Sequence, residues 1–363
     1  MGQGGSQPAP LKTLDARRVR VHASGMGLMI DLSALVANWK ALAARAPAAR
    51  PGAVVKADAY GLGAAKVAPA LYAAGARDFF VAVASEGREL RPHLPDDARI
   101  MVLSGHMEGE DLTGLIPMLN SPAQFFRDRA LRPKGAFGIQ LDSGMNRLGF
   151  EPGEWAAVRA EAVAAGPVLV MSHLACADEP DHAANAAQLA AFRAMTDGLD
   201  VPRALAATGG ILLGPEFHFD LVRCGVGMYG AEPFLTAASV VTLSIPVIQT
   251  RELQPGESVG YGYSWTATRP SKIATLAAGY ADGLPRALTG KGVNFWAGET
   301  AVPMIGRVSM DLITVDVTDL AVVPAELELL NAKQGVDDLA KLAGTIGYEI
   351  LTSLGRRYSR VWR

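Results

Sequence analysis

The chain has 363 residues, of which 50% are hydrophobic and 19% are charged, so it suits about two globular domains and excludes a disordered polypeptide. Its 34 basic and 36 acidic residues give a formal net charge of −2, so no excess of positive charge would draw it to nucleic acid. Two cysteines, Cys176 and Cys224, are too few for a disulfide framework, and their apolar surroundings favour a reducing compartment.

Residues 1–24 are expected to form a flexible leader. Met1-Gly-Gln-Gly-Gly-Ser6 formally fits a myristoylation pattern, but a polar leader explains it better. No apolar segment follows it, so a secretory signal is not expected. Further along, the 18 residues from Pro233 to Thr250 carry no charge. Their prolines and β-branched residues favour buried strands over a membrane span.

Short apolar segments alternate with helical patterns between residues 25 and 235. Asp31 is expected to cap a helix that Pro47 ends. The alternation, at about every 25 residues, predicts a parallel sheet, and the number of segments favours a closed (β/α)₈ barrel of the TIM type over an open sheet. A second helix is predicted from the spacing of Leu189, Phe192, Met195 and Leu199. The candidate strands end near Ile30, Lys56, Val83, Leu103, Leu119, Leu141, His173, Ala207 and Arg223.

Residues 236–363 show a different pattern, in which glycines separate short strands, and this predicts a mainly antiparallel β domain. Apolar and more polar residues alternate from Val308 to Ile313, as they do in a strand. One helix is expected after Gly335, with Val336, Leu339 and Leu342 on its apolar face, before a basic tail.

The most informative segment is Gly52-Ala-Val-Val-Lys56-Ala-Asp-Ala-Tyr60-Gly-Leu-Gly63, in which Lys56 ends an apolar strand before a glycine-rich turn. On a barrel this position lies at the C-terminal face, where active sites form. Desolvation there would lower the pKa of the lysine and make its amine a nucleophile or a Schiff-base former. From this segment alone, a strand-end lysine that only reaches solvent is an equally good interpretation.

Other polar residues also follow predicted strands and would share that face. Arg147 offers a guanidinium suited to a carboxylate, and His173 ends another strand. Glycine turns with exposed amides, at Thr208-Gly-Gly210 and Arg223-Cys-Gly225-Val-Gly227, would suit a phosphate. Taken singly, each has a structural alternative: a surface ion pair, a satisfied core histidine or a simple turn. Their common position at strand ends carries the functional prediction.

The second domain adds two tyrosine segments, Val259-Gly-Tyr261-Gly-Tyr263 and Ala278-Gly-Tyr280-Ala-Asp-Gly283. Tyrosines of this kind are often packing residues with a hydrogen-bonded hydroxyl. If Tyr261 acts instead as an acid or base, a nearby cation is needed to lower its pKa. Periodicity does not distinguish these two interpretations.

Taken in order, these segments resemble the alanine racemases, a family that uses pyridoxal 5′-phosphate. The resemblance also includes Gly306-Arg307-Val-Ser-Met310-Asp311 and covers nearly the whole chain from about residue 27. It implies an isomerase that interconverts L- and D-alanine and supplies D-alanine for peptidoglycan. It further implies a cytoplasmic homodimer with shared active sites and without a metal.

The resemblance also implies residue roles. Lys56 would bind the cofactor covalently and act as one base, and Tyr261 from the other subunit would act as the opposite base. The other implied positions are His173 and Arg223 at the cofactor ring, Tyr60, Thr208, Gly225 and Val226 at the phosphate, and Arg147, Met310 and Tyr280 at the substrate and its entrance.

Several positions depart from commoner members of the family. Gln140 stands where several have a lysine carbamate that orients the arginine, so its amide is expected to hold Arg147 and activity to be insensitive to bicarbonate depletion. Thr208 replaces a serine, Leu62 replaces a frequent histidine, and Arg356 lies near a position where some members place a tyrosine on the phosphate.

Three other functions fit parts of the sequence. A racemase that also accepts serine or other small amino acids is the nearest, because pocket size cannot be read from the sequence. A barrel-fold decarboxylase is disfavoured by the Tyr280 segment and by an arginine at the ring nitrogen. A non-enzymatic cofactor-binding barrel would lack the second domain.

Overall fold

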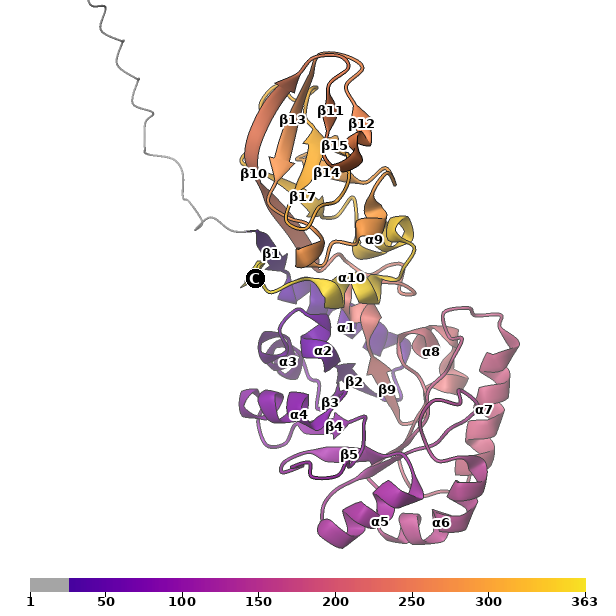
Figure 1. The fold of residues 1–363 in the computed structure, drawn as a ribbon. Helices are drawn as coiled ribbons and strands as arrows, with labels where there is room; N and C mark the ends of the chain where they lie inside the picture. Colours follow the sequence, from indigo (N-terminus) through magenta and orange to yellow (C-terminus); the bar gives the residue numbers. More distant parts are fainter. Residues whose placement is uncertain (1–25) are drawn as a thin grey trace, which may run out of the picture.

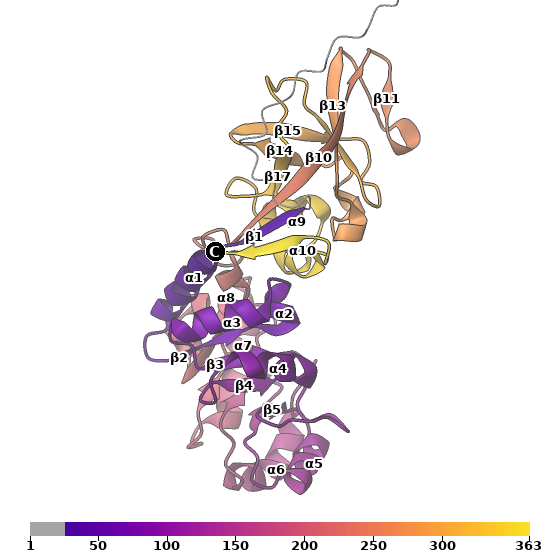
Figure 2. The same cartoon turned by 90° about the vertical axis from the view of Figure 1, so that its left-hand side faces the viewer.

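The computed structural model describes residues 26–363, so the predicted leader at residues 1–24 lies outside the described residues. The chain is elongated, with a parallel sheet surrounded by helices at one end and antiparallel strands at the other (Figures 1 and 2). Helices α9 and α10 and the chain's C-terminus lie between these two parts.

Eight parallel strands form the first sheet, in the spatial order β8-β7-β6-β5-β4-β3-β2-β9. Its ends meet, because Ala207 beyond β8 bridges in parallel to Arg223 of β9, whose N–H donates to the Ala206 carbonyl at 2.9 Å. The predicted (β/α)₈ barrel is therefore confirmed. Its strands are β2 (Arg50–Val54), β3 (Asp78–Val81), β4 (Arg99–Val102), β5 (Ile116–Leu119), β6 (Gly138–Gln140), β7 (Val170–Met171), β8 (Arg203–Ala204) and β9 (Leu221–Cys224).

The first part of the chain also contains eight α-helices within its described residues. Asp31 caps α1 as predicted, since its carboxylate accepts the N–H of Ala34 at 2.8 Å. Helix α7 ends earlier than predicted, at Thr196, so Leu199 lies outside it. The helices are α1 (Leu32–Arg45), α2 (Lys56–Tyr60), α3 (Ala64–Ala73), α4 (Ala84–Leu90), α5 (Pro122–Leu131), α6 (Pro152–Ala164), α7 (Ala183–Thr196) and α8 (Thr208–Leu213). Short 3₁₀ turns are η1 (Arg91–His93), η2 (Pro215–Phe217) and η3 (Val226–Tyr229).

The second sheet has the order β13-β16-β15-β14-β17-β10-β1-β18 and is antiparallel except for the β1–β18 pair. β11 and β12 form a separate two-stranded hairpin. The strands are β10 (Val241–Leu253), β11 (Ser258–Val259), β12 (Trp265–Thr266), β13 (Ser271–Leu276), β14 (Asn294–Ala297), β15 (Thr300–Ile305), β16 (Ile313–Asp316), β17 (Glu326–Leu330) and β18 (Ser359–Trp362). The remaining elements are η4 (Tyr261–Tyr263), η5 (Tyr280–Asp282), η6 (Arg286–Leu288), α9 (Val336–Ala343) and α10 (Gly347–Ser353).

The structure corrects the position of the first strand, β1 (Gly27–Ile30), which was expected in the barrel. It pairs with β10 and β18 of the second sheet instead. The reason lies in its burial, because only alternate residues, Leu28 and Ile30, are buried. The barrel strand β3 is buried at every position, as strands covered on both faces are.

Two further expectations in the second part are corrected. Val308–Leu312 is a loop between β15 and β16, and its backbone carbonyls accept hydrogen bonds from the neighbouring Tyr280 loop rather than from a strand. The predicted helix after Gly335 is confirmed as α9, but a second helix, α10, follows it. The uncharged Pro233–Thr250 segment leads into β10, and among residues 26–363 no helix is long and apolar enough to cross a membrane.

Candidate active site

Lys56 lies just beyond β2, at the C-terminal end of a barrel strand, and begins an unusual turn. The four residues that follow it, Ala57 to Tyr60, all have φ between 53° and 56°, which is a left-handed helical conformation. For an L-residue this conformation costs roughly 1–2 kcal/mol. Four consecutive non-glycine residues keep this left-handed conformation only where contacts with the surrounding structure stabilise it.

Charges and burial around Lys56 favour its neutral amine. Burial lowers the pKa of Lys56, and the guanidinium groups of Arg147 and Arg223 lower it further, whereas the Glu86 carboxylate raises it. A lysine with a lowered pKa has more of the free amine that attacks a carbonyl carbon.

The buried Arg223 contacts the half-buried His173 at the same face of the barrel. Nη2 of Arg223 donates to the Ser172 carbonyl at 2.7 Å and lies 3.3 Å from Nδ1 of His173. Burial lowers the pKa of Arg223 to about 10, so the guanidinium keeps its charge at neutral pH. Burial lowers the pKa of His173 most, and the positive charges of Arg223, Arg147 and Lys56 also lower it, to about 3 in total.

A cluster of hydroxyl and amide groups lies near Gly225. Thr208 Oγ1 accepts the N–H groups of Gly225 at 3.1 Å and Gly227 at 3.3 Å. Because the oxygen accepts twice, its own O–H is available as a donor. A Cβ on Gly225 would lie 3.5 Å from both Thr208 Oγ1 and Tyr60 Oη, so the two hydroxyls converge on this backbone.

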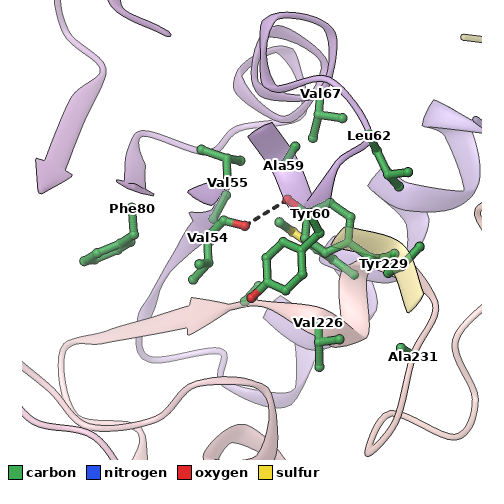
Figure 3. Packing of buried hydrophobic residues seen from close by; sticks show 14 of the residues in the cluster. Val54, Val55, Ala59, Tyr60, Leu62, Val67, Phe80, Val226, Tyr229 and Ala231 are labelled. Carbon is green, nitrogen blue, oxygen red and sulfur yellow. Dashed lines mark hydrogen bonds between the residues drawn. The ribbon is translucent and has the colours of Figure 1, made fainter. Parts of the chain in front are cut away.

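Tyr60 packs against two tyrosine rings, of which Figure 3 shows that of Tyr229. Its ring centroid lies 4.5 Å from that of Tyr229, whose hydroxyl donates to the Val54 carbonyl at 2.8 Å, and 6.0 Å from that of Tyr348 on α10. Burial raises the pKa of Tyr60 well above its usual value, so its hydroxyl remains a hydrogen-bond donor. Val226 is buried beside these rings.

Arg147 lies on the exposed loop after β6. The amide of Gln140 was expected to bind the Arg147 side chain, but it contacts the backbone of this loop instead. Gln140 Nε2 donates to the carbonyl of Leu148 at 3.2 Å, so the buried amide anchors the loop beside the arginine. Asp142 Oδ1 accepts the N–H groups of the next residues, Gly144 and Met145, at 2.8 and 2.9 Å.

The remaining candidate residues lie on the β domain. Tyr261, Tyr280 and Met310 expose 73%, 43% and 54% of their surface. Tyr261 begins η4 between β11 and β12, two strands that lie in the β domain away from the barrel (Figure 1). A single chain therefore does not bring Tyr261 to Lys56. Arg356 is also exposed.

Comparison with known proteins gives the family. The model described as "Alanine racemase, N-terminal domain" matches residues 30–233, and the model described as "Alanine racemase, C-terminal domain" matches residues 240–362. The chain belongs to the alanine racemase family. It is 61% identical to an alanine racemase of Cereibacter sphaeroides over 338 residues, which are 92% of this chain and 97% of that protein.

Other alanine racemases are similar along the same length. The chain is 60% identical to the alanine racemase of Dinoroseobacter shibae, with coverage of 92% and 97%. The crystal structure of the Bartonella henselae alanine racemase, with covalently bound pyridoxal phosphate, superposes with a TM-score of 0.88 at 37% identity. That match covers 94% of this chain and all of that one. Membership in the family makes the chain a pyridoxal phosphate-dependent isomerase.

The residues present fit the cofactor of an alanine racemase. Its aldehyde requires an amine that can lose its proton, and burial gives Lys56 that property. Its phosphate requires several donors, and the hydroxyls of Thr208 and Tyr60 converge at Gly225. Arg223 is a buried, charged hydrogen-bond donor beside His173.

Sequence reasoning missed two residues that shape this alanine racemase site. Tyr229 lies in the Arg223–Gly230 segment and packs on Tyr60. Its position in the sequence does not indicate that it would be buried against Tyr60. Glu86 accepts the N–H of Ala57, directly after Lys56, although the two residues are far apart in sequence. Its position in the first turn of a helix indicates only a capping residue.

Proposed function

We propose that this chain interconverts L- and D-alanine with two bases, Lys56 and Tyr261 of the partner subunit. Racemisation removes a proton from one face of the α-carbon and returns one to the other, so one base on each face serves both directions. Burial and two guanidinium groups favour the neutral amine of Lys56, and this observation carries the proposal.

The chain acts as a homodimer in this proposal, with each active site formed by two subunits. Tyr261 is exposed and belongs to the β domain, whereas Lys56 follows a barrel strand, and this supports a role for Tyr261 across an interface. Met310 and Tyr280 of the partner subunit join it, with the Met310 N–H and Arg147 binding the substrate carboxylate and Tyr280 lining the entrance.

The remaining residues hold and moderate the cofactor in this proposal. Pyridoxal phosphate, when bound, supplies an electron sink that acidifies the α-hydrogen. Tyr60, Thr208 and the Gly225–Val226 backbone bind the phosphate, and His173 lies beside the ring. Arg223 keeps its proton at the ring nitrogen, because its pKa of about 10 lies well above neutral pH. A donor that retains its proton limits electron withdrawal and restrains side reactions such as transamination.

The product supplies peptidoglycan precursors in the cytoplasm in this proposal. Cys176 and Cys224 are both free thiols, which fits a reducing compartment. Sequence similarity to biosynthetic and other bacterial alanine racemases is consistent with this role.

The first test is chiral analysis of L-alanine incubated with the enzyme and pyridoxal phosphate in D₂O. D-alanine with deuterium at the α-carbon is expected, because the returned proton comes from a base that exchanges with solvent. Exchange without inversion would mean that Lys56 works but that the opposite base is wrongly assigned. No exchange with the cofactor bound would contradict the proposed function.

A second test addresses the shared site. Lys56→Ala and Tyr261→Phe homodimers are each expected to be inactive, and mixing them should restore part of the activity. In a mixed dimer, one of the two sites has both bases intact if they come from different subunits. No recovery after confirmed subunit exchange would place both bases in one chain.

A further inference from the structure

Glu86, in the first turn of α4, joins the ends of two neighbouring barrel strands. Its Oε1 accepts the N–H of Ala57, just beyond β2, at 2.9 Å. Its Oε2 accepts the N–H of Ala82, just beyond β3, at 2.8 Å. Both carboxylate oxygens are therefore engaged by backbone amides at the face of the barrel that carries Lys56.

The Ala57 amide lies where the barrel strand and Lys56 give way to the left-handed turn. It follows Lys56 directly and begins the left-handed turn that ends at Tyr60. On the other side of Lys56, the Val55 N–H donates to the Phe80 carbonyl at 2.9 Å. Lys56 is thus held between a strand hydrogen bond and the Glu86 carboxylate, and the latter helps to offset the cost of the turn.

The charge of Glu86 also affects Lys56. The groups that influence the amine come from several elements: Arg147 from the loop after β6, Arg223 from β9 and Glu86 from α4. The two guanidinium groups lower the pKa of Lys56, and the Glu86 carboxylate raises it. His173, from the loop after β7, is held neutral by burial and by the same cations.

We propose that Glu86 is a positioning residue for Lys56, because its carboxylate fixes the left-handed turn that carries Lys56 and Tyr60 at its two ends. This inference rests on the proposed function of Lys56. In this role the length of the side chain sets the geometry of the turn, and its charge sets the fraction of free amine at a given pH.

Two substitutions separate length from charge. Glu86→Asp keeps the charge but is one methylene shorter, so it cannot reach both amides. Glu86→Gln keeps the length but removes the charge, and its NH₂ group cannot accept an amide N–H. Glu154→Gln is the matched control, because Glu154 also accepts a backbone N–H at the start of a helix, that of Glu151 at 3.1 Å, on α6.

The measurements are the rate of pyridoxal phosphate capture by the full-length apoenzyme across a pH series, and kcat and KM for L-alanine. Glu86→Asp is expected to slow capture and reduce kcat about tenfold or more, without moving the pH profile, because the amine is misplaced. Glu86→Gln is expected to move the capture profile to lower pH, because the pKa of Lys56 falls without the carboxylate. Glu154→Gln should leave both measurements at wild-type values.

Wild-type capture rates, pH profile and kcat in both Glu86 variants would overturn the inference and leave Glu86 as a helix cap. If Glu86→Asp does not fold, the pH profile of Glu86→Gln, the variant closest in shape, decides. A wild-type chain that captures no pyridoxal phosphate at Lys56 would instead overturn the proposed function, and the role of Glu86 with it.

Discussion

Nη2 of Arg223 lies 3.3 Å from Nδ1 of His173, and this contact sets the protonation state of the histidine. A guanidinium only donates hydrogen bonds, so Nδ1 must accept and the imidazole proton belongs on Nε2. Burial first, and then the positive charge of Arg223, lower the pKa of His173 to about 3. His173 is therefore neutral in the folded enzyme throughout the physiological range.

This state predicts a pH dependence of stability. The unfolded chain binds a proton at His173 below about pH 6.5, whereas the folded chain does not until the pH approaches its lowered pKa. The stability that neutral His173 contributes is complete above the unfolded pKa and is lost as the pH falls through this window. In His173→Asn, the free energy of unfolding should therefore depend on pH more weakly, by about one proton. Denaturant unfolding from pH 7 to 4 measures it, and equal slopes would mean that His173 is already charged in the folded state.

The hydroxyl of Thr208 is expected to contribute both to the free energy of unfolding and to cofactor binding. Thr208→Val keeps the shape but leaves the Gly225 and Gly227 N–H groups without their acceptor, at a cost of about 1–3 kcal/mol. The variant should also bind pyridoxal phosphate more weakly, because a phosphate donor is lost. Denaturant unfolding and cofactor titration measure the two effects, and Thr208→Ser should remain near wild type. Cofactor affinity unchanged in Thr208→Val would remove Thr208 from the phosphate site.

The backbone at Gly279 lies against the loop that contains Ser309 and Met310, so a larger residue is not expected to fit there. A Cβ at this position would lie 2.3 Å from the backbone oxygens of both Ser309 and Met310. Gly279→Ala should push these loops apart and reduce kcat/KM about 100-fold, because Met310 and Tyr280 both move. The control is Gly153→Ala on α6, where a Cβ meets no atom within 4 Å and should stabilise the helix by about 0.5–1 kcal/mol. Steady-state kinetics of the two variants compare them, and normal kinetics in Gly279→Ala would contradict the assignment of these loops to the site.

Arg357 connects the same two loops to the C-terminal segment. Its Nε and Nη2 donate to the buried Asp282 carboxylate at 2.6 and 2.8 Å, and its Nη1 donates to the exposed Asp311 at 2.7 Å. Asp282→Asn should lower the free energy of unfolding by about 1–3 kcal/mol, since the buried Asp282 side chain loses charge-assisted hydrogen bonds to the half-exposed Arg357. Asp311→Asn should change the free energy of unfolding by less than about 1 kcal/mol, because an exposed ion pair contributes little.

The Asp311→Asn variant should nevertheless raise KM for alanine, because the Met310 loop loses its contact with Arg357. Thermal unfolding and initial rates check both statements, and an unchanged KM would separate Asp311 from substrate binding.

Much of the fold follows from local patterns. The strands of the barrel end within about three residues of the predicted positions, and α1 begins at the predicted cap, because burial periodicity and capping act over short stretches of chain. Lys56, His173 and Arg223 could be placed at one face for the same reason, since the C-terminal ends of parallel barrel strands meet there.

The errors occur where distant contacts decide the outcome. Alternation from Val308 to Ile313 is typical of a strand, yet the backbone before Ile313 bonds to the Tyr280 loop and remains irregular. β1 has the length and composition of a barrel strand, but pairing with β10 and β18 places it in the other sheet. Neither partner of β1 lies near it in the sequence.

The sequence by itself determined the family, the barrel and the set of polar residues at the strand ends, because each depends on residue types in a fixed local order. Only the tertiary structure decided the left-handed turn after Lys56, the Glu86 contact that supports it and the neutral state of His173. Backbone strain is tolerated, and a pKa is shifted, by groups that folding brings together from separate strands and helices. Sequence spacing does not record such contacts.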